Sequence, residues 1–158
     1  MRVLTLAVVL VLAPLAGPAA AQSGANSACN QALSYEKAAA ANGATAQARY
    51  DAATAGLAMN ARCNDAQMKL VNEAYLLSMR APAAHDLHLG DWQRDMTRAN
   101  QLLTECTRTP GLRGAKPGND CAMQLRDNAA VTTIMTTTPS PLPSASPSPS
   151  PSPRAQHR

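Results

Sequence analysis

The chain has 158 residues, 12 of them proline, and only 3% of its residues are aromatic, with no phenylalanine. The formal net charge of +4 could favour a nucleic acid or a membrane surface as partner, but Arg2 lies in the N-terminal segment, and Arg154 and Arg158 lie near the C-terminus. Between them, basic and acidic residues are nearly balanced and interleaved, which excludes the basic run typical of a nucleic-acid binder.

Residues 1–21 have the features of a cleavable secretory signal peptide, with cleavage expected before Gln22. Arg2 precedes an apolar stretch over residues 3–12, and alanines occupy positions 19–21. The stretch is about half as long as the roughly 20 residues that a membrane-spanning helix needs, and Pro14 follows it. An uncleaved anchor is therefore disfavoured, and polar residues before Cys29 disfavour a lipid anchor there. We expect a secreted or periplasmic protein with no membrane span in its mature chain.

Residues 22–131 are expected to form one all-α domain, a small bundle of four to five helices arranged as helical hairpins. Alanine is abundant over residues 28–84, and no stretch alternates apolar and polar residues as a strand would. A first helix is expected to begin after Asn26 or Ser27 and to end at Asn42 and Gly43. A second helix is expected over residues 45–60.

The third helix is expected to begin at Asn64 and to end at Pro82. Asn64 can cap its first turn while Gln67 reaches back, which is a variant of the capping box. Its broad apolar stripe predicts a central position in the bundle.

A fourth helix is expected to open with Asp91 as its cap, and a short fifth helix to cover residues 120–128. The fifth helix would present Cys121 and Leu125 together. Apolar residues of the fourth are spaced alternately four and three apart, as in a heptad seam: Trp92, Met96, Ala99, Leu103 and Cys106. Residues 132–158 are rich in proline and serine and are expected to form a disordered tail.

The four cysteines are expected to form two disulfides, because an exported domain with few aromatic residues needs covalent support. Three pairings are possible. We favour Cys106 with Cys121, since the segment between them is rich in glycine and proline, which leaves Cys29 with Cys63. A structural zinc site is disfavoured, because such sites use cysteines two to four residues apart.

Part of the chain resembles a tetratricopeptide repeat. Ala46, Tyr50 and Ala53, with Leu33 upstream, are spaced like part of that repeat, and a second set echoes the spacing of its second helix: Ala99, Leu103 and Cys106. The two copies lie further apart than the roughly 34 residues that the family uses. The resemblance implies packed helical hairpins and identifies no family.

One polar constellation could bind a metal ion. His85, His88 and Asp91 recur every three residues, and imidazole and carboxylate groups are ligands for zinc and copper. Gly90 and the cap at Asp91 instead favour a solvated loop.

The methionines are spread one per element and are expected to fill gaps in the core: Met59, Met68, Met79, Met96, Met123 and Met135.

No catalytic or cofactor-binding motif stands out, so no enzyme and no cofactor are predicted. Ser34 and Ser78 lie outside any nucleophile elbow, and no glycine-rich phosphate loop is present. The leading hypothesis is an exported, non-enzymatic interaction or structural module that binds another protein or macromolecule of the cell envelope or secretome. The alternatives are a small metal or ligand carrier that uses residues 85–91 and, after that, an enzyme of unrecognised type.

Overall fold

The computed structural model describes residues 19–137, and this range contains five α-helices and no strand. The helices are α1 (Ala19–Ala39), α2 (Ala46–Asn60), α3 (Ala66–Asp86), α4 (Trp92–Arg108) and α5 (Lys116–Thr137). The predicted all-α class is confirmed. Residues 1–18 and 138–158 lie outside the described range, so the signal peptide and the tail stay predictions.

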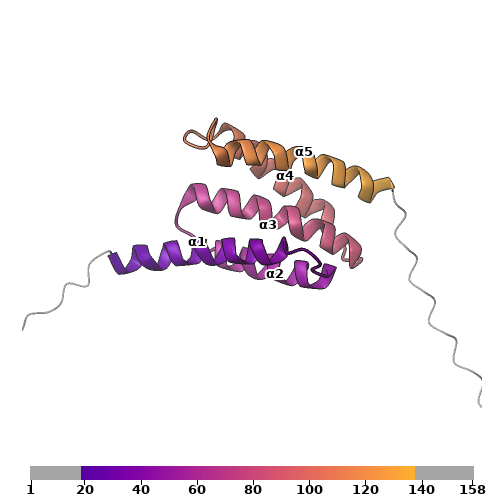
Figure 1. Cartoon of the computed structure of the whole chain (residues 1–158), viewed down its shortest axis with the longest axis horizontal. Coiled ribbons are helices and arrows are strands. Elements are labelled where there is room, and N and C mark those ends of the chain that lie inside the picture. Colours follow the sequence, from indigo (N-terminus) through magenta and orange to yellow (C-terminus); the bar gives the residue numbers. More distant parts are fainter. Residues whose placement is uncertain (1–18, 138–158) are drawn as a thin grey trace, which may run out of the picture.

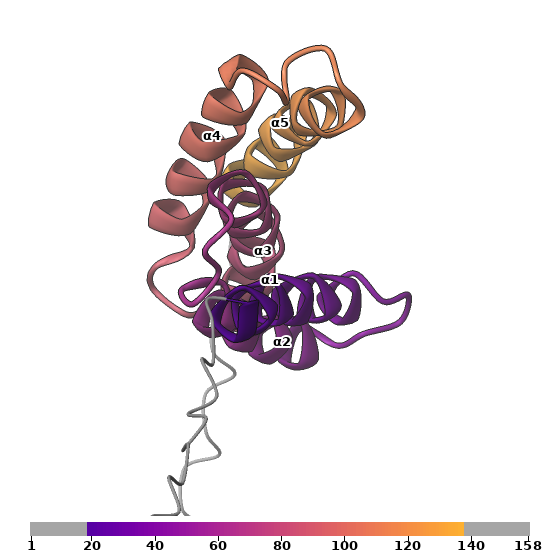
Figure 2. The same cartoon turned by 90° about the vertical axis from the view of Figure 1, so that its left-hand side faces the viewer.

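Helix α3 is the axis of the fold. Successive helices run in opposite directions, and α3 contacts each of the other four. The α1–α2 hairpin lies on one side of α3, and the α4–α5 hairpin lies on the other (Figures 1 and 2). The predicted central position of the third helix is therefore confirmed.

Adjacent leucines of α3 face different hairpins. Leu76 is fully buried against Ala32 and Ala53 of the first hairpin. Leu77 packs with Ala99 and Leu103 of the second hairpin. Because neighbouring positions on a helix point about 100° apart, one helix can serve two apolar clusters in this way.

Buried amide side chains also tie α3 to both hairpins. The Asn72 Nδ2 group of α3 donates a hydrogen bond to the carbonyl oxygen of Cys29 in α1 at 3.1 Å. On the other side, Asn128 Nδ2 of α5 donates to Ser78 Oγ of α3 and to Asn100 Oδ1 of α4, both at 2.9 Å. Such bonds fix the orientation of the helices around a core made largely of small apolar groups. Other orientations would leave a buried amide without its hydrogen-bond partner, which costs free energy.

Both predicted disulfides are confirmed. Cys29 of α1 is bonded to Cys63, which follows α2, and Cys106 of α4 is bonded to Cys121 of α5. Because the helices alternate in direction, both crosslinks lie at the end of the array where α3 begins (Figure 1). The opposite end holds the α3–α4 turn and the last residues of α5.

Several helix ends differ from the predictions. Helix α1 begins at Ala19, inside the predicted signal peptide, and ends at Ala39, ahead of the turn in which Gly43 has a φ of 78°. Helix α2 agrees with its prediction, and the Thr45 side chain caps it.

The predicted cap of the third helix is wrong, because Asp65 accepts the capping hydrogen bond. Gln67 instead donates to the carbonyl oxygen of Pro110, in the α4–α5 loop.

The prediction that Pro82 ends the third helix is also wrong. Helix α3 continues past it to Asp86. Ala81, Ala83 and Ala84 around the proline are buried, so packing of this turn against its neighbours outweighs the missing backbone hydrogen bond.

Helix α5 is much longer than predicted. It begins at Lys116 and ends at Thr137, so the prediction of a short helix over residues 120–128 is wrong. The extra turns are held because Val131 and Met135 pack against Ala81 and Met96. Cys121 and Leu125 belong to one cluster, as predicted.

The predicted seam of α4 is confirmed for Met96, Ala99, Leu103 and Cys106, which are all buried. Trp92 is half-buried and packs against the cluster that contains Met96. Asp91 occupies the N-cap position, but its side chain makes no capping hydrogen bond.

Within residues 19–137, none of the helices has the length and apolar character that a bilayer span requires.

Replacement of Gly56 by alanine should destabilise the protein. A Cβ atom at this position of α2 would lie 2.6 Å from Leu76 Cδ2 and 2.9 Å from Tyr35 Cβ, which is closer than carbon atoms pack. In an exposed helix the change would stabilise by about 1 kcal/mol, but here we expect a net loss of about 1–3 kcal/mol in the free energy of unfolding. Urea denaturation measures it, with the exposed Thr54→Ala of the same helix as control. Equal stability of the Gly56→Ala and Thr54→Ala variants would contradict the close packing.

Candidate functional site

A groove of about 690 Å³ lies along α4 and α3 and reaches α2. Half-buried Leu57 of α2 and the edge of the buried Leu77 of α3 form the apolar part of its wall, while α4 supplies charged and polar groups that include Asp95 and Arg98. A groove with apolar surface between charged walls is a usual shape for a binding site.

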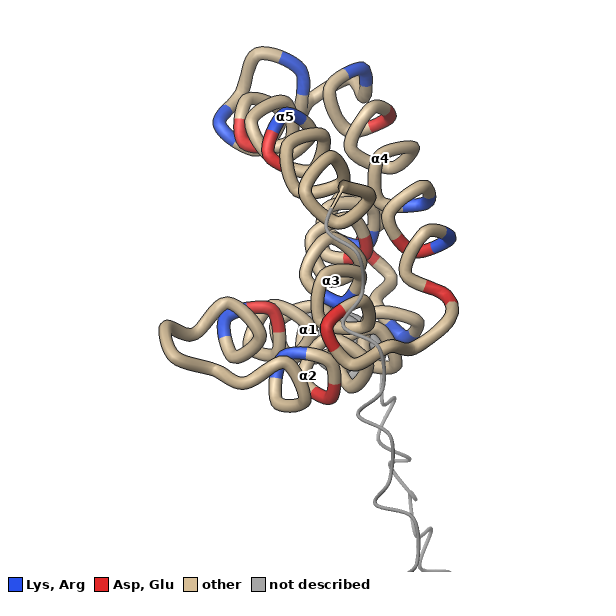
Figure 3. The backbone as a smooth tube through the Cα atoms, turned by 90° about the vertical axis from the view of Figure 1, so that its right-hand side faces the viewer, with Lys and Arg blue, Asp and Glu red and all other residues tan. Residues whose placement is uncertain are grey.

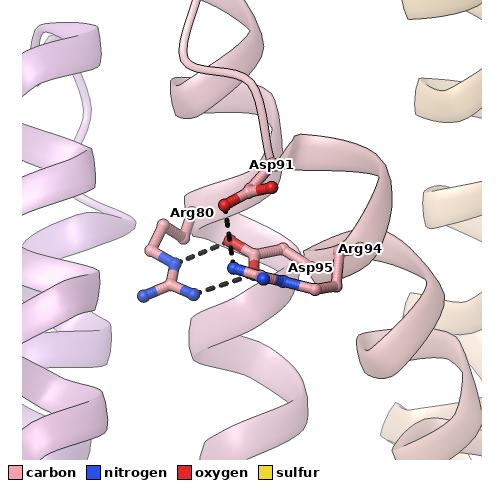
Figure 4. A network of polar contacts seen from close by, with 4 residues as sticks. All are labelled: Arg80, Asp91, Arg94 and Asp95. Atoms are coloured by element: carbon pink, nitrogen blue, oxygen red, sulfur yellow. Dashed lines mark hydrogen bonds and ion pairs between the residues drawn. The ribbon is translucent and has the colours of Figure 1, made fainter.

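Arg80 of α3 and Asp95 of α4 form the most buried ion pair of the groove. The guanidinium donates two hydrogen bonds, from Nε to Oδ2 at 2.7 Å and from Nη2 to Oδ1 at 2.8 Å (Figure 4). The Asp95 side chain is only 7% exposed. These hydrogen bonds raise the pKa of Arg80, although its burial acts in the opposite direction. The Arg80 guanidinium therefore stays charged, and its two hydrogen bonds to Asp95 fix α4 on α3.

Two further arginines of α4 lie at the rim of the groove. Arg94 donates to Asp91 at 2.9 Å, and Arg98 donates to Glu73 of α3 at 3.2 Å. Their side chains are 73% and 51% exposed, so each keeps N–H donors that face solvent. Arginines alternate with acidic residues along α4 (Figure 3). The groove is therefore nearly neutral, and it suits a partner with a few placed charges better than a polyanion.

The predicted metal-binding residues occupy the turn between α3 and α4 at the end without disulfides. His85 lies in the last turn of α3, His88 follows the helix, and Asp91 precedes α4. The Asp91 carboxylate is bound by Arg94 (Figure 4). Across residues 19–137, no three His, Cys, Asp or Glu side chains gather in a way that would hold a metal ion.

A second cavity, of about 510 Å³, lies beside this turn. His85 and His88 line it together with Trp92 at the start of α4 and Met135 near the end of α5, whereas Asp91 does not line it. The structure thus places the two histidines beside Trp92, which was predicted to lie in the core, and Met135, which lies within the predicted tail. Because these residues are far apart in the sequence, no local pattern could predict that they line one cavity.

The backbone at His88 is strained. Its φ is 57°, and among the described residues it is the sole non-glycine residue with positive φ. The His88 amide donates to the His85 carbonyl and the Leu89 amide donates to the Ala84 carbonyl, which is the Schellman pattern of helix ends. Glycine usually occupies this position, and another residue there costs about 1 kcal/mol.

Two other titratable groups have displaced pKa values. Burial raises the pKa of Glu36 on α1 to about 7, although Lys37 lowers it in part. Burial and the nearby Asp120, Glu36 and Asp127 carboxylates raise the pKa of Tyr75 to about 12. Neither Glu36 nor Tyr75 lines the groove or the cavity described above.

The two serines considered as nucleophiles serve the helices. The Ser34 hydroxyl donates to the Asn30 carbonyl, and the Ser78 hydroxyl donates to the Ala74 carbonyl while it accepts from Asn128.

Comparisons with family models, with curated proteins and with solved structures find no match to this chain.

The loss of one partner from the Arg80–Asp95 pair should be worse than the loss of both. Asp95→Ala leaves a largely buried guanidinium without its carboxylate, and we expect a loss of about 3 kcal/mol in the free energy of unfolding. The double variant Arg80→Met, Asp95→Leu removes both charges and keeps their volume, so it should be more stable than the single variant. Urea denaturation of the three proteins measures this. A double variant as unstable as Asp95→Ala would show that the pair does not dominate this contact.

Proposed function

We propose that the chain is an exported, non-enzymatic interaction module that binds a segment of another exported protein in the groove between α2, α3 and α4. The observation that carries the proposal is the composition of this groove. Its apolar surface at Leu57 and Leu77 lies beside two arginines, Arg94 and Arg98, whose guanidinium groups remain open to solvent.

Export is supported by the two disulfides, which persist in oxidising compartments. A secreted or periplasmic location, and the cleavable signal peptide that would lead to it, belong to the proposal.

The chemistry of the groove defines the partner. An apolar side chain of the partner would lie against the two leucines and lose contact with water. A carboxylate of the partner would accept hydrogen bonds from Arg94 or Arg98, which are spaced one helical turn apart on α4. The preferred ligand is therefore a protein segment with an apolar residue next to an acidic one.

The groove is also suited to binding because an ion pair links two of the helices that form its walls. The bidentate contact between Arg80 and Asp95 joins α3 to α4 below the rim. Walls that do not move on binding require less ordering of side chains and backbone, which favours affinity.

The proposal predicts that partner capture depends on Arg98. The full processed protein would be crosslinked in the exported fraction of its source organism, and the captured protein would then be titrated in purified form. Arg98→Glu places a negative charge at the rim and should weaken binding at least about tenfold. The matched control is Arg126→Glu, which makes the same change at an exposed position of α5.

The control should bind as the original protein does, and circular dichroism would show that both variants are folded. Equal binding by the two variants, or capture of no protein at all, would contradict the proposed role of the groove.

A further inference from the structure

The cavity beside the α3–α4 turn gathers nitrogen and sulfur donors from separate helices. His85 ends α3, His88 follows in the turn, and Met135 comes from the end of α5. These residues line one cavity, at the end of the array opposite to the disulfides. The cavity adjoins the groove proposed above for a protein partner, since Gln93 lines both, but none of the three donors lines that groove.

The surroundings hold two of these donors in place. The His85 side chain is 17% exposed, and its ring meets the Trp92 ring edge to face, with centroids 5.3 Å apart. Met135 is buried among Ala81, Met96 and Val131 while it lines the cavity. Donors fixed by packing need little reorganisation to bind a ligand.

His88 adds a separate observation. It occupies the left-handed position of a Schellman motif, where glycine would relieve the backbone strain, and the sequence has a glycine only two residues further on. Strained backbone positions cluster at functional sites, which makes the imidazole at this position a candidate ligand. His88 lines the same cavity as His85.

We propose that His85, His88 and Met135 form a binding site for copper in its Cu(I) state. Thioether sulfur is a soft ligand that favours Cu(I), and imidazole also suits copper. Harder ions would prefer carboxylates, but Asp91 is bound by Arg94 and does not line the cavity. Asp86, whose Oδ1 lies 3.5 Å from His85 Nδ1, does not line it either. All four cysteines are in disulfides, so among the described residues thioethers are the soft donors that remain.

The single tryptophan of the chain makes the site directly measurable. Trp92 lines the cavity, so a bound copper ion should quench its fluorescence. The probe is Cu(I), kept reduced with ascorbate, which leaves the disulfides intact, and a chromogenic chelator competes for the metal. The full processed chain would carry His157→Ala, because the chain has three histidines and this one lies outside the described residues.

The expected result is quenching that saturates at one Cu(I) per chain, with Zn(II) bound at least about tenfold more weakly. Met135→Leu keeps the volume of the side chain and should weaken Cu(I) binding at least about tenfold. The matched control is Met123→Leu, on the same helix but with 53% of Met123 exposed, and it should bind Cu(I) unchanged.

His88→Gly separates a functional role from a structural one. It should raise the melting temperature by a few degrees, because glycine relieves the strain, and it should at the same time weaken Cu(I) binding. The proposal is overturned if no saturable quenching occurs, if Zn(II) binds as tightly as Cu(I), or if Met135→Leu and His88→Gly bind Cu(I) like the original protein.

Discussion

The two disulfides close the same end of a helical array that has little aromatic mass to hold it together. Cys29–Cys63 joins α1 to the turn between α2 and α3, and Cys106–Cys121 joins α4 to α5. By restricting the unfolded chain, each crosslink of this kind stabilises a fold by about 2–4 kcal/mol. Between the crosslinked hairpins lies α3, whose neighbouring residues Leu76 and Leu77 serve separate clusters. Small residues around it permit close approach, and Asn72 and Asn128 tie it to the two hairpins.

The opposite end of the array is held without a disulfide, and the cavity and the groove lie at this end or beside it. No disulfide joins the α3–α4 turn to α5, so this end depends on the Arg80–Asp95 pair and on the cluster around Met96 and Met135. This end contains the strained backbone at His88 and the cavity of about 510 Å³ beside it. The stabilisation from the disulfides at one end can offset the cost of the strained backbone and the cavity at the other end, since local strain must be offset elsewhere in a fold.

Much of the architecture could be predicted from the sequence because the signals were local. Alanine content and glycine positions gave the helix count, the spacing on α4 gave its buried face, and the cysteine positions gave the pairing. The errors came where packing outweighed local preference. Pro82 lies within α3 because buried alanines surround it, and α5 extends into a threonine-rich segment because Met135 is buried against Met96.

The candidate sites were harder to predict, because they depend on contacts between distant residues. Nothing in the sequence links Arg80 to Asp95, or His85 to Met135. The predicted histidines do line one cavity, but Asp91 is bound by Arg94, and a methionine expected only to fill the core takes its place at the cavity wall. Sequence spacing singled out the two histidines that line this cavity and could not identify the methionine.

The most direct test of this account is disulfide mapping of the native protein. The protein would be alkylated without reduction, digested, and analysed by mass spectrometry before and after reduction. The account predicts no alkylated cysteine and two linked peptides, one joining Cys29 to Cys63 and one joining Cys106 to Cys121. Four alkylated cysteines in native material would contradict both the exported scaffold and the way in which its helices are held.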